Sequence, residues 1–202
     1  NYFWFFTVVF KKKFLVIGAN GLIGEAVLKE IPLPHTVYGT YHSREIPQAI
    51  KCDITDFNSL QKVFSFVKPT HVIHCANLAG GVLFCEKNPN LAKKLHWEGT
   101  IHLGKLAQDY QSRLLFISSE GVFDGKKEKY TEEDDHSPLN VYGKLKAESE
   151  LWIKKNLEDR WQMIENQLKT KDQMLLALRT SHRSLASNWR TLASQIENLS
   201  KT

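Results

Sequence analysis

Short apolar runs alternate with longer segments of helical period through most of the chain. The runs that are typical of buried parallel strands cover residues 13–17, 36–40, 49–53, 71–76 and 113–118. The segments with helical spacing cover residues 22–31, 57–67, 90–110 and 142–156. Strands that alternate with helices favour a parallel sheet with helices on both of its faces. We therefore predict an α/β fold, a doubly wound parallel sheet of the Rossmann-like type, that forms a dinucleotide-binding domain over residues 13–157.

The first twelve residues differ from this pattern. Residues 3–10 are apolar and aromatic, and Lys11, Lys12 and Lys13 follow them. The apolar run is too short to cross a bilayer as a helix, which takes roughly 20 residues. The three lysines also follow the apolar run, whereas the charged residues of a signal peptide precede its apolar run. We interpret residues 1–12 as an extension that adds a strand or packs on a partner, with membrane contact by residues 1–13 as the alternative.

The last part of the chain, residues 158–202, has a weaker pattern. It contains a polar, helix-prone stretch, an apolar run at 174–178, and apolar residues at helical spacing in 185–199. Two interpretations remain open for it. The segment is either a truncated part of a substrate domain or a short helical appendage with another purpose.

Composition is that of an ordinary globular domain, with 42% hydrophobic and 24% charged residues among 202. Most of the net charge of +5 arises in the residues after 150, where bases are mixed with acids, and no nucleic-acid-binding motif accompanies them. We therefore expect no nucleic-acid partner. Cys52, Cys75 and Cys85 lack zinc or disulfide spacing, and the eight histidines lack metal-ligand spacing, so no metal site is expected. Free thiols indicate the cytoplasm or another reducing compartment.

A glycine-rich turn joins the first predicted strand to the first predicted helix. Gly18 follows the strand, and Gly21, Leu22, Ile23 and Gly24 lead into the helix. Glycines at these places permit a tight turn and a close approach of the backbone to a pyrophosphate. The N-terminus of the helix then offers N–H groups and partial positive charge to the phosphates. The order strand, turn and helix therefore predicts a dinucleotide site, with these five residues as contacts.

The ends of the next strands refine the cofactor hypothesis. An acid after the second strand would bind the ribose of NAD, but this chain has Arg44 there, which suits a 2′-phosphate. We therefore favour NADP(H), with NAD(H) as the alternative. Asp53, with Ile54, is placed to meet the adenine, although Asp53 could equally cap the helix that follows. Cys75 and Ala76, at the end of the fourth strand, are further candidate cofactor contacts.

Tyr142 and Lys146 are one helical turn apart and share a face of the predicted helix. A free tyrosine has a pKa near 10, and a nearby ammonium should lower this pKa. Tyr142 is therefore a candidate acid for a carbonyl that accepts hydride. A hydroxyl at the end of the fifth strand, Ser118 or Ser119, would hold the carbonyl oxygen.

Three stretches in this order resemble one branch of the extended short-chain dehydrogenase/reductases. They are Ile117–Gly125, Tyr130–Asp134 and Pro138–Lys146, and Cys52–Asp56 also fits. The branch contains dTDP-4-dehydrorhamnose reductases and methionine adenosyltransferase regulatory β-subunits, and the resemblance covers roughly residues 13–157. It implies that Ser119, Tyr142 and Lys146 form the catalytic triad and that Gly18, Gly21 and Gly24 form the cofactor loop. It further implies that Tyr142 and Lys146 contact the cofactor, Lys146 at the nicotinamide ribose.

Three features depart from the family. His96 stands where the family usually has an Asn that organises the active-site helix and its proton relay. Gly80, Gly81 and Val82 replace a more polar loop, and the chain ends before a full substrate domain. Residues 178–181 resemble the next family strand, but only with an insertion before them.

Two functions are therefore compatible with the sequence. The first is an NADP(H)-dependent reductase of a keto group, plausible on a nucleotide-linked sugar, whose partner is the small carbonyl substrate. The second is a non-catalytic nucleotide-binding or regulatory subunit, with a protein partner. In both cases we expect an oligomer or a subunit of an assembly.

Overall fold

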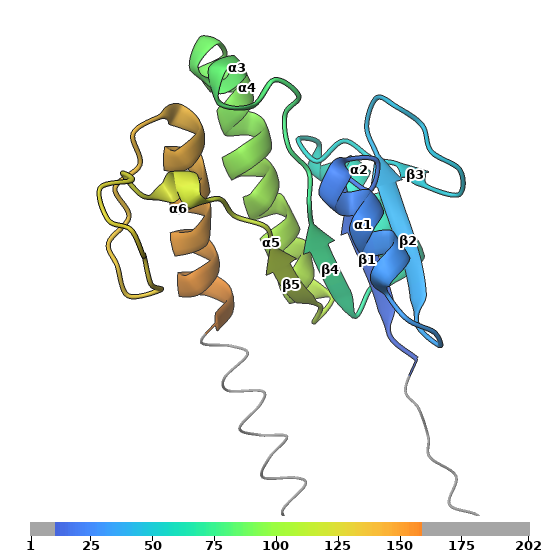
Figure 1. Cartoon of the computed structure of the whole chain (residues 1–202). Coiled ribbons are helices and arrows are strands. Elements are labelled where there is room, and N and C mark those ends of the chain that lie inside the picture. Colours follow the sequence, from blue (N-terminus) through green and yellow to red (C-terminus); the bar gives the residue numbers. More distant parts are fainter. Residues whose placement is uncertain (1–10, 159–202) are drawn as a thin grey trace, which may run out of the picture. The chain divides into compact units, whose positions relative to one another are not determined.

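The computed structural model describes residues 11–158, and the predictions for residues 1–10 and 159–202 lie outside the described residues. Within residues 11–158, five parallel strands form one sheet in the order β3-β2-β1-β4-β5 (Figure 1). The strands are β1 (Lys13–Ile17), β2 (Thr36–Tyr41), β3 (Ile50–Lys51), β4 (His71–His74) and β5 (Arg113–Phe116). This order is that of the doubly wound nucleotide-binding sheet, so the predicted fold class is confirmed.

The connections between the strands are helical. The α-helices are α1 (Leu22–Glu30), α2 (Phe57–Val67), α3 (Gly81–Lys87), α4 (Pro89–Lys93), α5 (Gly99–Asp109) and α6 (Val141–Ile153). The short irregular helices are η1 (Lys94–Glu98, π), η2 (Glu120–Val122, 3₁₀) and η3 (Lys154–Glu158, π). None of the helices within residues 11–158 is long and apolar enough to cross a membrane.

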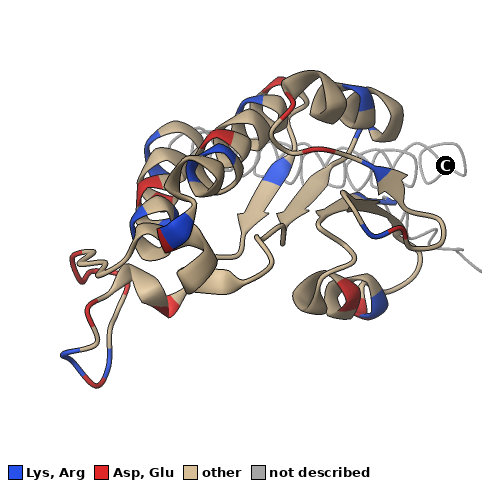
Figure 2. Cartoon of the chain, turned by 90° about the horizontal axis from the view of Figure 1, so that it is seen from above, with Lys and Arg blue, Asp and Glu red and all other residues tan. Residues whose placement is uncertain are grey.

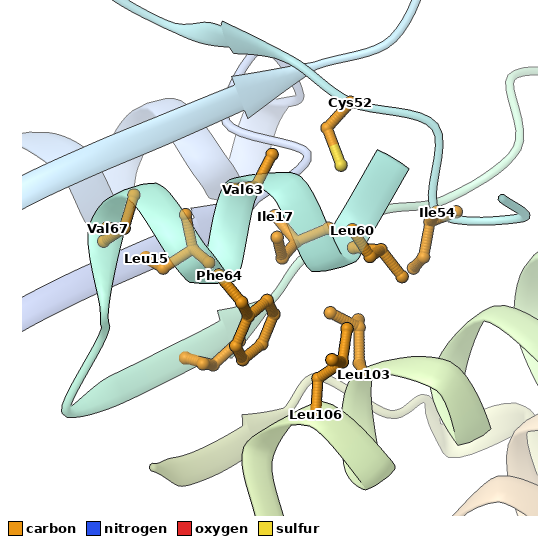
Figure 3. Packing of buried hydrophobic residues seen from close by; sticks show 11 residues of the cluster. Leu15, Ile17, Cys52, Ile54, Leu60, Val63, Phe64, Val67, Leu103 and Leu106 are labelled. Atoms are coloured by element: carbon orange, nitrogen blue, oxygen red, sulfur yellow. The ribbon is translucent and has the colours of Figure 1, made fainter. Parts of the chain in front are cut away.

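Alternating residues of β1 supply the two faces of the core. Leu15 and Ile17 are buried against residues of α2 and α5, among them Phe64 and Leu103 (Figure 3). Val16, between them in sequence, belongs to a second cluster that α1 covers. This period of two is the ordinary geometry of a strand, and it places helices on both faces of the sheet. The carboxyl ends of the strands are thereby left for the loops that carry the candidate site.

Two segments differ from the sequence prediction. The stretch that contains Gly80, expected to be a loop, leads into α3, with Gly80 as the N-cap at a φ of +94°. The helix predicted over residues 90–110 is continuous but includes the π-helical turn η1. The third, fourth and fifth strands are shorter than predicted, because their last residues enter the loops at the sheet edge.

Helix α6 packs closely on α5. A Cβ on Gly104 would lie 2.3 Å from the ring of Trp152, so the glycine is needed for the two helices to approach. The amide of Gln108 donates to the main-chain oxygen of Asn156 at 2.7 Å and so binds η3, the turn that continues from α6, to α5. The helix that carries Tyr142 is therefore fixed against the core of the sheet domain.

Candidate functional site

The turn between β1 and α1 is so tight that two of its glycines have no room for a side chain. Gly18 has a φ of +78°, and a Cβ there would lie 2.6 Å from the Cα of Ala76. A Cβ on Gly24 would lie 2.3 Å from the main-chain oxygen of Gly18. Gly21, the N-cap residue of α1, has no side chain with which to cap the first N–H groups. The turn therefore leaves these groups and the positive end of the helix available to a phosphate.

The neighbouring predicted contacts lie at the same edge of the sheet. Leu22 is 90% exposed and Ile23 is 48% exposed, so the first turn of α1 offers main-chain N–H groups more than apolar packing. Ala76 follows β4, which is adjacent to β1 in the sheet. This is the point where the strand order reverses and where ligands of such sheets bind.

Two further predicted cofactor contacts, Ile54 and Cys75, are held by the core and by the sheet. Ile54 is 6% exposed and packs in the core, so only its main chain is left for a ligand. The N–H of Cys75 donates to the oxygen of Ile17 at 2.9 Å, which extends the pairing of β4 with β1 by one residue. Burial raises the pKa of the Cys75 thiol, and the ammonium of Lys146 acts in the opposite direction. Cys75 is thus a neutral neighbour of Lys146 at neutral pH.

Arg44 and the glycine turn are joined by two hydrogen bonds. The guanidinium of Arg44 donates to the main-chain oxygen of Asn20, and the amide of Asn20 donates to the main-chain oxygen of Arg44 at 2.9 Å. The guanidinium also lies 3.5 Å from the carboxylate of Glu25. The cation therefore stands beside the turn, as contact with a 2′-phosphate requires, although Glu25 competes for it.

Asp53 is held by the residues that follow it. Its Oδ1 accepts from the N–H and the hydroxyl of Thr55, each at 2.8 Å, and its Oδ2 lies 3.7 Å from His42. Burial raises the pKa of Asp53, but the bonds from Thr55 and the charge of His42 outweigh burial and lower it. The N-cap of α2 is Asp56, whose carboxylate accepts from the N–H of Asn58 at 2.9 Å. The capping role considered for Asp53 is therefore wrong.

Ser119 and Tyr142 are brought together by two short connections. Ser119 is the N-cap of η2, and its Oγ accepts from the N–H of Gly121 at 3.1 Å. A Cβ on Gly143, at the start of α6, would lie only 2.0 Å from the oxygen of Gly121. Because η2 and α6 approach so closely, Ser119 and Tyr142 are brought together: a Cβ on Gly121 would lie 3.4 Å from the Oγ of Ser119 and 4.0 Å from the ring of Tyr142. The neighbouring Ser118 has a buried hydroxyl without a partner among the described residues.

Lys146 faces the sheet more than it faces Tyr142. Its ammonium donates to the main-chain oxygen of Ile117 at 2.8 Å and lies 4.4 Å from the ring centre of Phe116. The ring centre of Tyr142 is 5.8 Å away. Burial lowers the pKa of Lys146 to about 8, and the charge of Glu150 opposes this shift.

The phenol of Tyr142 has its pKa raised, chiefly by burial. Side-chain hydrogen bonding with Ser119 and with Asn77 acts in the opposite direction. The expectation that the ammonium of Lys146 lowers this pKa is wrong, because Lys146 is held by the end of β5. Tyr142 is therefore protonated at neutral pH and has a proton to give, but in the unliganded protein it is a weaker acid than a free tyrosine.

The side chain of His96 lies behind the candidate acid. It is 1% exposed, and its ring meets the ring of Tyr142 edge to face at 5.1 Å. Its Nε2 is 3.8 Å from the sulfur of Cys85. Burial, with a smaller contribution from Lys146, lowers the pKa of His96 to about 4, so the imidazole is neutral at physiological pH.

The main chain of His96 joins three elements. Its oxygen accepts from the hydroxyl of Thr100 on α5 at 2.6 Å and from that of Ser149 on α6 at 2.9 Å. Thr100 is also hydrogen-bonded to Nε2 of His74 on β4 at 3.1 Å. All four residues are buried, so this network fixes α6 relative to the sheet.

Sequence reasoning missed Asn77 and the tie between α3 and α6. The carboxylate of Glu86 on α3 accepts a hydrogen bond from the N–H of Val141 at the start of α6. Asn77 had an available signal, since it is a polar residue directly after the fourth predicted strand. The tie from Glu86 had none, because nothing local in the sequence reveals which helix N-terminus a surface carboxylate meets.

Metal-ligand groups give no sign of other sites in the described residues. The positions of basic and acidic residues are interspersed along the ribbon of the helices and loops (Figure 2). Within residues 11–158 there is no group of three or more His, Cys, Asp or Glu side chains that could hold a metal ion. The site that the described residues do form is the one at the carboxyl ends of β1, β4 and β5.

The fold and the arrangement of this candidate site are those of the extended short-chain dehydrogenase/reductase class. A family model described as "RmlD substrate binding domain" matches residues 12–163, and the chain belongs to this family. A similar curated protein is methionine adenosyltransferase 2 subunit beta of Bos taurus, 34% identical over 147 residues. That match covers 72% of this chain and 43% of the relative. A probable low-salt glycan biosynthesis reductase of Haloferax volcanii is 32% identical over 142 residues, which cover 67% of this chain and 46% of the relative.

Solved structures agree with this assignment. A hypothetical dTDP-4-dehydrorhamnose reductase from Sulfolobus tokodaii has a TM-score of 0.65 and 32% identity, over 69% of this chain and 50% of that one. The dTDP-4-dehydrorhamnose reductase from Bacillus anthracis, solved in complex with NADP, has a TM-score of 0.66 and 28% identity. It matches 74% of this chain and 51% of that one. The chain thus spans about half the length of the relatives that it matches.

Proposed function

We propose that the chain is an NADP(H)-dependent reductase of a keto group on a nucleotide-linked sugar. The observation that carries the proposal is the close approach of η2, which begins after Ser119, to the start of α6, which carries Tyr142, at the same sheet edge as the glycine turn. A hydroxyl and a protonated phenol side by side form a site for one carbonyl oxygen. Family relatives named as reductases support this reading.

The residues of the turn fit a dinucleotide. The glycines Gly18 and Gly24 keep free the space that a side chain would take, and α1 directs its N-terminus to that place. When bound, a nicotinamide cofactor would supply the hydride. Arg44 would favour the 2′-phosphate of NADP(H), although Glu25 weakens this preference and NAD(H) stays the alternative.

The protein's own part is to hold the carbonyl and give it a proton. Ser119 would donate a hydrogen bond to the carbonyl oxygen and orient it. Tyr142 would transfer its proton to that oxygen as negative charge develops there. Lys146, held by Ile117, would bind the nicotinamide ribose with the part of its ammonium that faces the site.

A regulatory subunit is the second candidate, and the relatives named methionine adenosyltransferase 2 subunit beta favour it. Its partner would be a protein rather than a sugar substrate. Exposed leucines and a valine near the start of α3 and α6 supply apolar surface for such a partner: Val82, Leu83 and Leu139. Assembly into an oligomer and residence in a reducing compartment, the latter supported by three free cysteines, are part of both proposals.

A titration of the full chain with NADPH and with NADH, followed by fluorescence, tests the cofactor site. The control is Gly21→Asp. A Cβ at Gly21 would lie 3.4 Å from its nearest neighbour, the oxygen of Gly18, and Asp is a favourable N-cap. The variant should therefore fold while its carboxylate repels the pyrophosphate. Saturable binding that this variant loses supports a cofactor site, and no binding of either nucleotide by the wild type refutes it.

A screen of nucleotide-linked keto sugars then separates the two functions. NADPH oxidation that Tyr142→Phe abolishes, with cofactor binding retained, would identify a reductase. Cofactor binding without turnover of any keto sugar would favour the regulatory subunit, which a pull-down with a methionine adenosyltransferase catalytic subunit would then test.

A further inference from the structure

Basic side chains predominate at the edge of the sheet where the strands begin, which is opposite to the edge that carries the candidate site. The strands are parallel, so the amino ends of β2, β1, β4 and β5 lie side by side at this edge (Figure 1). Exposed bases lie at these strand starts and at the ends of the helices that return to them: Lys11, Lys12, Lys68, Arg113, Lys154 and Lys155. We call these residues the basic edge.

Main-chain hydrogen bonds hold the strand starts together. Thr36, the first residue of β2, donates its N–H to the oxygen of Lys12 at 2.9 Å. Thr70, directly before β4, donates its N–H to the oxygen of Lys13 at 2.9 Å, and its own oxygen accepts from the N–H of Arg113 at 2.9 Å. Since neighbouring strands are about 4.8 Å apart, the main chains at Lys12 and Arg113 are roughly 10 Å apart. Their charges therefore act on the same small area of surface.

The helix ends of the basic edge are fastened to the same part of the domain. The ammonium of Lys13 donates to the main-chain oxygen of Val67 at 3.2 Å, and the exposed Lys68 follows as the C-cap of α2. The amide of Gln108, near the end of α5, donates to the oxygen of Asn156 at 2.7 Å. This bond holds η3, which carries the last two lysines of the basic edge.

The cations of this edge also act on one another. Burial lowers the pKa of His71, the first residue of β4, and the charges of Lys12 and Arg113 lower it further. Glu30, at the end of α1, and Asp109, at the end of α5, are exposed acids of the same edge. Among the described residues these acids are fewer than the bases, so the edge as a whole attracts anions.

The residues directly before the basic edge are apolar and aromatic. Residues 3–10 lie outside the described residues, and their sequence contains four phenylalanines and a tryptophan, followed by Lys11 and Lys12. Aromatic side chains next to lysines are typical of segments that bind at the interface of a bilayer. A nucleic acid would pair with the same bases, but it has no apolar interior that could receive residues 3–10. The two features together therefore favour a lipid surface.

We propose that the basic edge and residues 3–10 together dock the protein on an anionic lipid bilayer. The bases lie against the head groups, and residues 3–10 enter the boundary between head groups and acyl chains. Both parts are needed, because one short apolar insertion gives only marginal binding and stable attachment takes a second signal. Each base near an anionic surface strengthens binding about fivefold, so three bases contribute on the order of a hundredfold.

Docking at this edge leaves the candidate site open to solution. Strand β1 has 5 residues and joins the two edges of the sheet. At about 3.3 Å per residue, it holds the glycine turn roughly 16 Å from the membrane side. The proposal is therefore compatible with either function of the site, and its outcome does not depend on cofactor binding or on turnover.

The test is co-sedimentation of the full chain with lipid vesicles. One set of vesicles contains phosphatidylcholine alone, and the other contains phosphatidylcholine with about one third phosphatidylserine. The wild type should bind the phosphatidylserine vesicles on the order of a hundredfold more strongly, and added salt should weaken this binding because it screens exposed charges. Equal binding to both kinds of vesicle, or binding to neither, would overturn the proposal.

Two triple variants separate the basic edge from net charge. The edge variant combines Lys11→Gln, Lys12→Gln and Lys68→Gln, and the control variant combines Lys51→Gln, Lys87→Gln and Lys144→Gln. All six lysines are exposed, and the control lysines lie at or after the carboxyl ends of the strands. Both variants should unfold close to the wild-type temperature. The edge variant should lose binding to phosphatidylserine vesicles by about a hundredfold and the control variant should keep it. Equal binding by the two variants would overturn the proposal.

A third variant tests the apolar part and the competing partner. Trp4→Ser, Phe5→Ser and Phe6→Ser together should abolish vesicle binding without changing the unfolding temperature. A short DNA duplex serves as the alternative anion for the same proteins. If the wild type binds the duplex more tightly than the vesicles, and the serine variant binds it equally well, the basic edge is a nucleic-acid surface and the proposal is wrong.

Discussion

Lys146 donates to the main-chain oxygen of Ile117 at 2.8 Å, and this bond places its ammonium against the end of β5. The charge is almost fully buried, with 3% of the residue exposed. A buried ammonium is costly even with one good acceptor, which is why its pKa falls to about 8. The folded protein thus contains a buried positive charge, and the free energy that this charge costs depends on pH.

The first prediction concerns this cost. The unfolded chain binds a proton at Lys146 up to its ordinary pKa of 10.5, whereas the folded chain releases it near 8. Between these values the unfolded state binds more protons, so stability rises with pH. From pH 8 to 9.5 the wild type should gain about 2 kcal/mol in free energy of unfolding relative to Lys146→Met. Urea titrations at several pH values measure this gain.

Lys146→Met also loses the bond to Ile117. This loss lowers the free energy of unfolding at every pH and does not change how that free energy varies with pH. Lys144→Met, on an exposed position of the same helix, serves as the control and should run parallel to the wild type. If the free energy of unfolding of Lys146→Met also runs parallel to that of the wild type over this pH range, the ammonium of Lys146 is solvated in the folded protein.

The second prediction concerns cofactor choice. Arg44→Ala removes the guanidinium beside the glycine turn but keeps the main-chain oxygen that accepts from Asn20. We expect about a tenfold loss of affinity for NADPH, equal to roughly 1.4 kcal/mol, and little change for NADH. Glu25→Gln, which removes the competing carboxylate 3.5 Å from Arg44, should strengthen NADPH binding. Equal losses for both nucleotides in Arg44→Ala would assign Arg44 to the turn and not to the 2′-phosphate.

The strand and helix pattern alone was enough to predict the fold. Buried parallel strands are continuous apolar runs, and the five runs, the glycine turn and the Tyr142 helix all lie where the sequence placed them. The helix of residues 57–67 was predicted at its observed bounds from its helical spacing and from Pro69 after it, although its N-cap is Asp56 and not Asp53. Local signals of this kind lie in the sequence within or next to the element that they define.

The details of the site were harder to predict because they depend on contacts between distant segments. The sequence shows Tyr142 and Lys146 on one helical face, but the bond from Lys146 to Ile117 spans 29 residues. The cluster that Leu78 and Tyr142 share depends on how α3 packs on α6, for which no local pattern exists. The pKa of Tyr142 was therefore predicted to fall, whereas burial makes it rise.

The third prediction concerns the approach of η2 to α6. Gly143→Ala would place a Cβ 2.0 Å from the oxygen of Gly121, so the two segments must separate. We expect a loss of about 1–3 kcal/mol in the free energy of unfolding, as for overpacked cores. Because η2 carries Ser119 and α6 carries Tyr142, any reductase activity should fall as well. Thermal unfolding and NADPH oxidation measure the two effects.

Gly121→Ala is the matched control for that variant. A Cβ on Gly121 would meet the hydroxyl of Ser119 at 3.4 Å, which is an ordinary contact. This variant should unfold close to the wild-type temperature. If Gly143→Ala is equally stable, then η2 and α6 are further apart in solution than the structure shows.

The last prediction concerns acid stability and His96. Its folded pKa is about 4, against an ordinary value of 6.5, because its ring is buried behind Tyr142. Between these values the unfolded chain binds the extra proton, so stability falls as the pH falls from 6.5. Between pH 6.5 and 5, His96→Asn should lose about 2 kcal/mol less free energy of unfolding than the wild type loses. The measurement is the free energy of unfolding of both proteins at several pH values in this range. His42→Asn, at a ring that is 69% exposed, should leave the slope as it is. The buried His74 contributes in the same direction in all three proteins, so a slope that His96→Asn does not change would assign the acid lability to His74 instead.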